Sequence, residues 1–383
     1  MIITIIADVL GEENNGTTIT VTQLIGELKN RGHTVRVVST RKVENDDSYY
    51  TLPKRSFGIF TKYIEKNGAI MAKPVEKVIY DAVVDADVVH IVLPFKVGKF
   101  TMKLLGKLNK PYTTAFHCQP ENITAHVGCR NVKWINKLLY KRFHHQFYKH
   151  AKFIHCPSVF IAKELEKLGY KANLRAISNG VLPIFKEQPT EKPDELKDKY
   201  CILYMGRFSK EKRHEVLIDA VAKSKYKDKI QLIFTGIGPL KDKLQKKGNT
   251  LPNPLKIWFL SQEEQIKTLN YCDLYVHASD VELESIACTE AICCGLVPII
   301  SDSKTSATNT FALTEHNLFK SGNSDDLAMK IDFMIENPEV KEELKEQYRD
   351  YSKQFQLGYC IDKMEEMFQD AIKANNEQEK EDK

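Results

Sequence analysis

The chain has 383 residues, of which 42% are hydrophobic and 28% are charged. This length suits two domains of about 150 to 200 residues each, and the composition excludes an intrinsically disordered protein. No apolar run reaches the roughly 20 residues that a membrane-spanning helix needs. Nine cysteines without a Cys-x-x-Cys pair favour a reducing compartment and no structural zinc, so we expect a cytoplasmic protein.

Charge is distributed unevenly along the chain. Residues 1–185 contain 27 Lys and Arg against 15 Asp and Glu, whereas residues 186–383 contain 29 against 36. A basic half joined to an acidic half predicts that the basic part faces an anionic partner, such as phospholipid head groups or nucleic acid.

Short β-rich segments alternate with helical patterns in the first half. Residues 2–7 form a predicted strand rather than a signal peptide, because a basic n-region and a long apolar h-region are missing. Residues 17–31 follow as a helix that stops at Gly32, with an apolar face made of Val21, Leu24, Ile25 and Leu28. Further strands are predicted at residues 34–39, 88–93 and 111–115.

The same alternation restarts after a polar, proline-bearing segment at residues 188–199, which we interpret as a linker. Predicted strands follow at residues 201–205, 231–235, 256–259, 274–277 and 297–301, and helices at 325–337 and 357–375 with a solvated tail beyond. This pattern predicts two α/β domains with parallel sheets, residues 1–187 and 188–355, followed by a C-terminal segment, 356–383. Ligands of such sheets bind beyond the carboxyl ends of the strands.

Three segments of the second half carry candidate binding residues. Gly206 and Arg207 directly follow a strand, and Lys212 lies near the start of the next helix. Together these residues are suited to binding a diphosphate. The alternative is a basic loop that is simply exposed to solvent, because such a loop has the same composition. Gly236 and Gly238 lie in a turn between a strand and a helix. Tight turns of this kind often contain glycine for steric reasons alone, so these two residues are weak evidence for a ligand.

The third segment contains two glutamates, Glu282 in a loop and Glu290 in the apolar helix that follows. A carboxylate on such a helix is costly unless it is paired or binds a ligand. The alternative to ligand binding is a structural ion pair with a buried arginine.

In this order and at these intervals, the three segments resemble glycosyltransferase family 4, together with Ser178-Asn179-Gly180-Val181 and Gly295-x-Val-Pro298. The resemblance implies a GT-B fold, which has two Rossmann-like domains with a cleft between them and a final helix that crosses back to the N-terminal domain. It also implies transfer from a nucleotide sugar with retention of anomeric configuration and without a metal cofactor.

The resemblance further implies roles for single residues. Arg207 and Lys212 would hold the diphosphate, Glu290 the ribose hydroxyls, and Glu282 the donor sugar near its reacting centre. Gly16 would leave room for the phosphates, and Gly236 belongs to the same donor-binding set. The chain departs from the family at Glu284-Ser285, where x-Phe-Gly is common after the first glutamate, and at Ser303–Thr308, where a glycine pair is usual.

A polar cluster follows the strand predicted at residues 111–115. His117 matches the family's histidine at the cleft and is, with Glu282, one of the two predicted catalytic residues. Without the family match, a histidine at a strand end whose nitrogens are hydrogen-bonded within the protein is the simpler interpretation. Gln119, Asn122 and Thr124 lie just beyond it and suit acceptor hydroxyls.

The pair Asp85 and Asp87 resembles a metal-binding Asp-x-Asp, but it precedes its strand, so we interpret both as solvated turn residues.

No acidic residue occurs from Asn122 to Lys163, a segment rich in cations with an apolar, aromatic stripe. A basic amphipathic helix of this kind is typical of segments that lie on anionic membranes. The alternative is a helix that packs on its own sheet through that stripe. The predicted membrane-facing residues are Arg130, Lys133, Trp134, Lys137, Lys141 and Arg142.

The sequence therefore predicts a cytoplasmic hexosyltransferase at the inner face of the cell membrane. It would move a hexose, with UDP-glucose as the expected donor, to a lipid such as diacylglycerol, as related diacylglycerol glucosyltransferases do. The alternatives are the same chemistry on a saccharide or polyprenyl-linked acceptor, an epimerase on the same fold, and a nucleic-acid-binding protein. The last is disfavoured because the aromatic residues lie on an apolar stripe rather than among glycines on a strand surface.

Overall fold

The computed structural model describes every residue of the chain except 9, 11–15, 57, 59–70, 126–131 and 382–383. The chain divides into two compact units: unit 1 contains Met1–Asn179 and Gly358–Lys383, and unit 2 contains Gly180–Leu357. The predicted linker at residues 188–199 lies within unit 2. There Leu196 is buried and Lys192 Nζ donates a hydrogen bond of 2.5 Å to Asp273.

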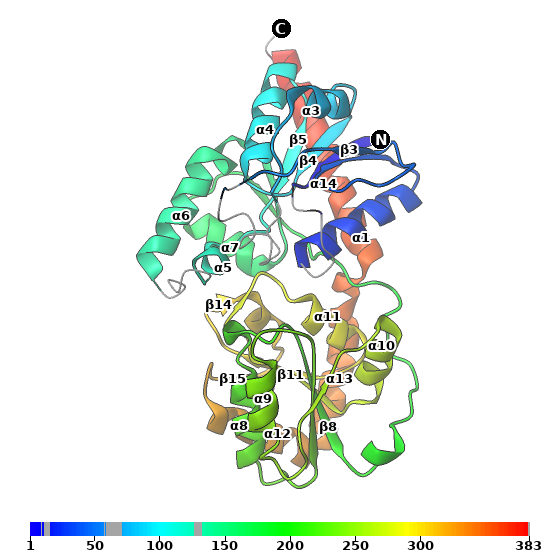
Figure 1. The fold of residues 1–383 in the computed structure, drawn as a ribbon, viewed down its shortest axis with the longest axis vertical. Helices are drawn as coiled ribbons and strands as arrows, with labels where there is room; N and C mark the ends of the chain where they lie inside the picture. Colours follow the sequence, from blue (N-terminus) through cyan, green and yellow to red (C-terminus); the bar gives the residue numbers. More distant parts are fainter. Residues whose placement is uncertain (9, 11–15, 57, 59–70, 126–131, 382–383) are drawn as a thin grey trace. The chain divides into compact units, whose positions relative to one another are not determined.

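Unit 1 is built on a seven-stranded sheet in the order β3-β2-β1-β4-β5-β6-β7, and all its strand pairs are parallel (Figure 1). The central strands are buried on both faces because helices cover the sheet. The strands are β1 (Ile2–Ile6), β2 (Thr34–Ser39), β3 (Tyr49–Thr51), β4 (Val88–Ile91), β5 (Tyr112–Ala115), β6 (Phe153–Cys156) and β7 (Asn173–Ala176).

The helices of unit 1 follow the apolar periodicity of the sequence. In α1 (Gly16–Asn30) the predicted face of Val21, Leu24, Ile25 and Leu28 is buried, and the chain turns at Gly32 with φ +81°. The other helices are α3 (Glu76–Val83), α4 (Lys96–Leu108), α5 (Pro120–Ala125), α6 (Lys133–Gln146), α7 (Val159–Lys167) and α14 (Leu357–Glu381).

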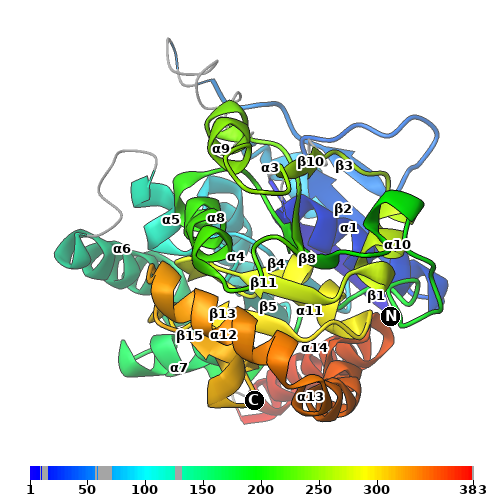
Figure 2. The same ribbon diagram turned by 90° about the horizontal axis from the view of Figure 1, so that it is seen from below.

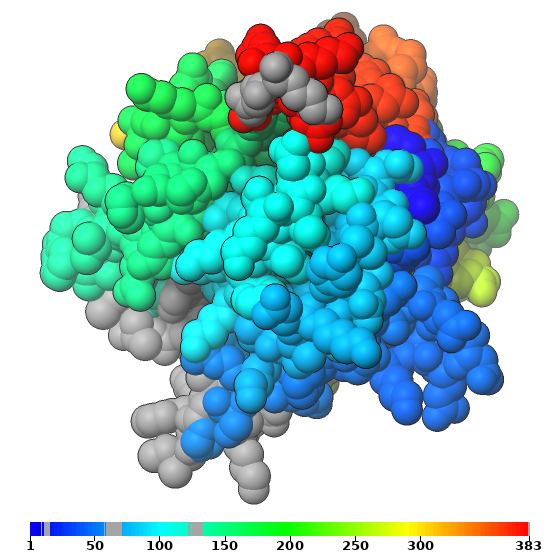
Figure 3. All heavy atoms as spheres, turned by 90° about the horizontal axis from the view of Figure 1, so that it is seen from above, coloured from blue at the N-terminus to red at the C-terminus, as the bar shows by residue number. Residues whose placement is uncertain are grey.

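Helix α14 packs on unit 1 along most of its length. Arg31 donates to Asp362 at 2.5 Å and to Glu365 at 2.9 Å, and near the other end Asn109 Nδ2 donates to Glu379 Oε1 at 2.6 Å. Figure 3 shows the red end of α14 against the cyan segment that contains α4. The predicted end of this helix at residue 375 is therefore too early, although most of the described residues beyond it are exposed, as predicted for a solvated tail. The helix continues to Glu381 because residues of its last turns bond to unit 1.

Unit 2 repeats the architecture with a six-stranded parallel sheet in the order β10-β9-β8-β11-β13-β15, with a separate pair β12-β14. Helices α8 and α12 lie side by side against it (Figure 2). The strands are β8 (Tyr200–Met205), β9 (Ile230–Thr235), β10 (Lys256–Trp258), β11 (Leu274–His277), β12 (Val281–Glu282), β13 (Pro298–Ser301), β14 (Thr305–Ser306) and β15 (Leu318–Phe319). The helices are α8 (His214–Lys223), α9 (Lys241–Gly248), α10 (Gln262–Tyr271), α11 (Ile286–Cys293), α12 (Ser324–Glu336) and α13 (Pro338–Tyr351).

Because the strands are parallel, their carboxyl ends share one edge of the sheet. In unit 2 this edge carries the loops at residues 206–212, 236–240, 278–282 and 302–308, which include most candidate residues of the second half. In the part of the chain that the structure describes, no helix is both long enough and apolar enough to cross a bilayer.

Candidate functional site

The loop that follows β8 is held by the loop that follows β9. Phe208 N donates to Ile237 O at 2.9 Å, and Leu240 N donates to Phe208 O at 3.1 Å. A Cβ atom on Gly236 would lie 2.2 Å from Gly206 O, and one on Gly238 would lie 2.5 Å from Phe208 O. The neighbouring backbone therefore leaves no room for a side chain at either position, and both must be glycine. Gly236 positions the 206–208 loop, and its direct contact with a donor stays a prediction.

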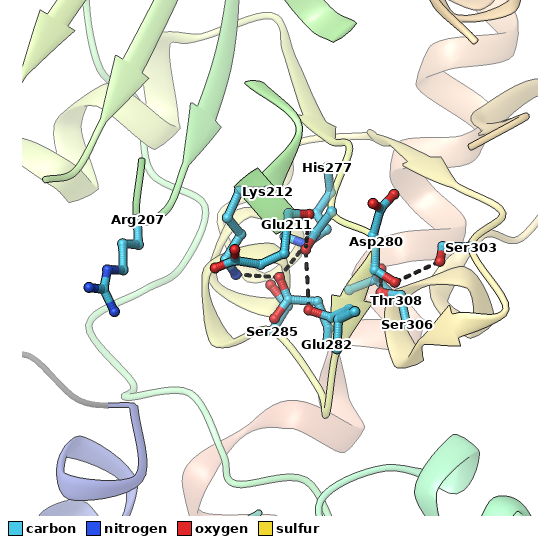
Figure 4. A network of polar contacts seen from close by, with 12 residues as sticks. Arg207, Glu211, Lys212, His277, Asp280, Glu282, Ser285, Ser303, Ser306 and Thr308 are labelled. Carbon is cyan, nitrogen blue, oxygen red and sulfur yellow. Dashed lines mark hydrogen bonds and ion pairs between the residues drawn. The ribbon is translucent and has the colours of Figure 1, made fainter. Parts of the chain in front are cut away.

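The two cations predicted to hold a diphosphate have different surroundings. Arg207 is exposed, and its side chain makes no hydrogen bond or ion pair with any residue that the structure describes. Lys212 is largely buried, and its ammonium group donates to the carboxylate of Glu282. In Figure 4 Arg207 lies apart from the contacts around Lys212. Arg207 is thus free to bind an anion, whereas Lys212 already has an anionic partner.

Glu282 lies on β12 with a side chain that is only 11% exposed. Its Oε1 atom accepts hydrogen bonds from Lys212 and, at 3.0 Å, from His277 Nε2. Burial by itself would raise the pKa of this carboxyl, but the charge of Lys212 and the bond from His277 outweigh it and lower the pKa to about 2. Glu282 is therefore an ionised hydrogen-bond acceptor at neutral pH.

Glu290 has the opposite electrostatic environment. It lies on α11, and Gln265 Nε2 donates to its Oε2 at 2.9 Å. Burial raises the pKa of Glu290 to about 8, with a smaller opposing effect from Gln265, so the group carries a proton at neutral pH. Glu290 forms no ion pair with a described residue, so the alternative of a partner arginine is wrong for this part of the chain. A protonated carboxyl can both donate to and accept from a pair of hydroxyls.

The positions at which the chain departs from the family surround Glu282. Ser285 has φ +88°, in the left-handed region that favours glycine. Ser303 Oγ and Thr305 Oγ1 donate to Asp280 O at 2.6 and 2.7 Å, and β14 pairs with β12 through Glu282 and Ser306. These residues therefore fix the strand that carries Glu282 (Figure 4).

In unit 1 the predicted catalytic histidine lies at the carboxyl edge of the sheet. His117 follows β5, and its ring lies edge-on to His155 at 5.3 Å between centroids. Burial, together with the nearby His155 and His90, lowers the pKa of His117 well below its ordinary value, so the ring is neutral at pH 7. Asp8 follows β1 at the same edge. Burial raises its pKa to about 7, and its Oδ2 has no partner among the described residues.

The predicted acceptor residues divide into three cases. Gln119 is buried. Thr124 is also buried, and its Oγ1 bonds to Asn136 Oδ1 at 2.8 Å, so this hydroxyl ties α5 to α6 and is not free for a substrate. The side chain of Asn122 lies outside the described part of the chain.

Gly16 opens α1, and a Cβ atom there would meet nothing within 4 Å. The room that Gly16 was predicted to leave for phosphates therefore stays a prediction.

Helix α6 has one face that packs on unit 1 and one face that is exposed, and contact of the exposed face with a membrane stays a prediction. Its inward face packs on unit 1 through the buried Tyr140 and Phe143. On its outward face Trp134 is 69% exposed and Leu138 58% exposed. The predicted Lys137, Lys141 and Arg142 are exposed as well. Arg130 and the side chain of Lys133 lie outside the described residues.

The predicted solvated pair of aspartates has protein partners. Asp85 receives two hydrogen bonds from the guanidinium of Arg36, and Asp87 Oδ2 accepts from Ile2 N at 2.7 Å. Both aspartates therefore form hydrogen bonds within the protein at the amino end of the sheet. Within the described ranges, no three or more His, Cys, Asp or Glu side chains are grouped as a metal ion would require.

His277, Asp280 and Asp8 were not singled out from the sequence. Each lies at or just beyond the carboxyl end of a predicted buried strand. A polar or ionisable residue in that position is itself a signal for a functional edge, and it was available in the sequence.

Two family models match the chain one after the other. The model of Glycosyltransferase Family 4 matches residues 14–183, and that of Glycosyl transferases group 1 matches residues 185–355. The chain belongs to glycosyltransferase family 4. The protein is accordingly an enzyme that transfers a sugar, and the predicted family and fold class are confirmed.

Two curated relatives show how far this similarity extends. The α-monoglucosyldiacylglycerol synthase of Acholeplasma laidlawii is 24% identical over 94% of this chain and 95% of that enzyme. The N-acetylgalactosamine-N,N'-diacetylbacillosaminyl-diphospho-undecaprenol 4-α-N-acetylgalactosaminyltransferase of Campylobacter jejuni is 27% identical over 52% of this chain. That match spans only 50% of the length of the Campylobacter enzyme.

Comparison with solved structures identifies the fold. HepE of Anabaena, solved with UDP and glucose, has a TM-score of 0.72 at 16% identity, covering 97% of this chain and 100% of that one. This likeness shows the GT-B fold. The catalytic domain of the cholesterol-α-glucosyltransferase of Helicobacter pylori is 42% identical over 40% of this chain and 96% of that chain, with a TM-score of 0.39.

Proposed function

We propose that this glycosyltransferase transfers a hexose from a nucleotide diphosphate sugar to a lipid hydroxyl with retention of configuration. UDP-glucose is the expected donor, diacylglycerol the expected acceptor, and the inner face of the cell membrane the expected location. Similarity over nearly the full length to an enzyme named as a glucosyldiacylglycerol synthase supports this acceptor class. The fold shared with HepE, which was solved with UDP and glucose, supports this donor class.

The chemistry follows from the charges at the carboxyl edge of unit 2. Bond breaking between the anomeric carbon and the diphosphate leaves negative charge on the phosphate and positive charge on the sugar. Arg207, which has no described partner, and the ammonium of Lys212 stabilise the leaving diphosphate electrostatically. The ionised Glu282 accepts hydrogen bonds from the sugar, and the carboxyl of Glu290 binds the ribose hydroxyls.

Retention requires that the acceptor oxygen bonds to the anomeric carbon on the face from which the diphosphate departs. The acceptor proton then passes to the leaving phosphate oxygen, which balances the step without a metal. Both curated relatives have names with an α linkage. Since nucleotide hexoses such as UDP-glucose carry an α linkage, an α product implies retention.

The observation that carries the lipid acceptor is the outward face of α6. Two large apolar side chains, Trp134 and Leu138, are exposed one turn apart among exposed cations. Exposed aromatic and aliphatic residues beside lysines and arginines suit the boundary between head groups and acyl chains. A soluble saccharide acceptor would give this surface no function.

The test is transfer of labelled glucose from UDP-glucose to vesicles that contain diacylglycerol and anionic phospholipid. Lys137→Gln, Lys141→Gln and Arg142→Gln are combined in one variant. The matched control neutralises three exposed lysines on α4: Lys96→Gln, Lys103→Gln and Lys107→Gln. Loss of three interfacial charges costs about 3 kcal/mol, so vesicle binding should fall by roughly 100-fold in the first variant only.

UDP release without acceptor lipid should be the same in both variants, since the predicted donor residues lie in unit 2. Equal vesicle binding by the α6 variant and the wild type would refute the membrane part of the proposal. Absence of transfer to any lipid, together with transfer to a soluble sugar, would refute the lipid acceptor.

A polyprenyl-linked acceptor is the second candidate, because the name of the Campylobacter relative includes diphospho-undecaprenol. Undecaprenyl-diphosphate sugars and simple saccharides are therefore assayed beside diacylglycerol. RNA binding at physiological salt without vesicle binding would favour the nucleic-acid alternative instead.

A further inference from the structure

Two polar rings lie on one face of β11, the strand that leads to Glu282. Tyr275 and His277 are two residues apart, so their side chains leave the strand on the same side. Both are fully buried, and their rings stack with centroids 6.1 Å apart. A buried imidazole at the carboxyl end of a strand is costly unless both its nitrogens have partners.

Both nitrogens of His277 do have partners. Nε2 lies 3.0 Å from Glu282 Oε1, and Nδ1 lies 3.3 Å from the Tyr275 hydroxyl. The ionised carboxylate of Glu282 can only accept, so Nε2 carries the hydrogen. The neutral ring then accepts at Nδ1 from the hydroxyl of Tyr275. Burial lowers the pKa of His277, despite its bond to Glu282, and raises that of Tyr275, which keeps the ring neutral and the phenol protonated.

This chain of bonds acts on one oxygen of Glu282. His277 and Lys212 both donate to Oε1, whereas Oε2 accepts no hydrogen bond from any described residue. With Oε1 held from two directions, Oε2 is the oxygen that a sugar hydroxyl can reach. Lys212 is also a predicted diphosphate ligand, so its bond to Glu282 competes with phosphate. The bond from the neutral His277 does not compete.

We infer that His277 is a positioning residue, which holds the catalytic carboxylate of Glu282 in place when Lys212 turns to the diphosphate, and that Tyr275 fixes the tautomer of His277. This rests on the proposed function of Glu282 and Lys212. His277 touches no reacting atom in this scheme. Its effect is on the orientation of Glu282, so it changes turnover more than donor affinity.

Three substitutions test the role. His277→Leu removes both hydrogen bonds at similar volume, and kcat for UDP-glucose hydrolysis should fall about 30-fold while the Kd for UDP changes less than about 2-fold. His277→Gln places an amide N–H near the position of Nε2 and should retain kcat within about 5-fold of wild type. Tyr275→Phe should lower kcat by about 3- to 10-fold.

His214→Leu is the matched control. His214 is equally buried in unit 2, but its ring stacks on Tyr204 and neither nitrogen has a hydrogen-bond partner among the described residues. This control removes a buried imidazole without removing a bond to Glu282, and kcat should stay near that of wild type. A kcat in His277→Leu equal to that in His214→Leu would overturn the inference, as would equal losses in His277→Leu and His277→Gln when both variants melt like wild type.

A spectroscopic measurement keeps the inference testable even if His277→Leu does not fold. Nitrogen-15 NMR of the histidine side chains should show His277 as the Nε2–H tautomer in the wild type, with an Hε2 resonance that moves upfield in Glu282→Gln. An Nδ1–H tautomer, or no change in Glu282→Gln, would overturn it. A wild type that shows this tautomer but neither binds UDP nor hydrolyses UDP-glucose would instead refute the proposed function alone.

Discussion

Removal of the cation from Lys212 should damage both activity and stability, whereas removal of the cation from Arg207 should damage activity alone. Lys212→Met and Arg207→Met keep the aliphatic part of each side chain and delete its charge. If each cation stabilises the departing diphosphate, each substitution should lower kcat/KM about 100-fold, which corresponds to about 2.7 kcal/mol of transition-state stabilisation.

The difference in stability follows from the environment of Glu282. The pKa of this carboxyl is lowered from 4.5 to about 2 in the folded protein, which corresponds to about 3 kcal/mol in favour of the folded state at neutral pH. Lys212 is the largest of the groups that lower it, and His277 accounts for the remainder. Lys212→Met should therefore cost about 2 kcal/mol. Arg207 is exposed and has no described partner, so Arg207→Met should cost almost nothing.

Urea unfolding and thermal melting of both variants, beside a UDP-release assay, measure the two quantities independently. For a domain of this size about 2 kcal/mol corresponds to a fall in Tm of about 4 to 8 °C. The matched pair of variants should thus share the catalytic loss and differ in Tm. Equal Tm values would refute the assignment of the Glu282 pKa to Lys212, and near-normal turnover in both variants would refute the diphosphate site.

Three further results are expected. Transfer should survive excess EDTA, and Asp85→Ala with Asp87→Ala should leave turnover near wild type because both carboxylates bond at the amino end of the sheet; activity lost on chelation and restored by Mn²⁺ would contradict this. Burial lowers the pKa of His90 to about 3 and of His155 to about 4, so the unfolded chain binds protons that unit 1 does not. The stability of unit 1 should be full above pH 6.5 and fall by up to about 1.4 kcal/mol per pH unit for each histidine between pH 6 and 4, and urea midpoints that stay constant over this range would contradict the burial of both rings. Ser285→Gly should raise stability by about 1 kcal/mol because serine is strained at φ +88°, and a lower Tm would show that the serine side chain contributes more than the strain costs.

Much of the fold could be predicted because the signals are local. The strands of both sheets are short apolar runs, and the helices between them repeat every three to four residues, as the buried face of α1 shows. Glycines that meet backbone, such as Gly236 and Gly238, are visible as turn residues even before their neighbours are known.

The partners of the charged residues could not be predicted in this way, because each partner lies far away in the sequence. Asp280 is bonded by Arg213 and by residues of the loop after β13, and Arg31 reaches α14 across more than three hundred residues. Thr124 was predicted to face an acceptor, but its hydroxyl bonds to Asn136 instead. A single residue type carries no information about which distant group will meet it.

The sequence by itself determined the family, the two parallel sheets and the sheet edge at which the loops after the strands carry candidate residues, because periodicity and strand direction are properties of short segments. Only the tertiary structure decided protonation and pairing. Glu282 and Glu290 are both partly buried carboxyls on neighbouring elements, yet one is ionised and the other carries a proton. The reason is that burial raises the pKa of both, and only Glu282 meets a lysine and a histidine that reverse the effect.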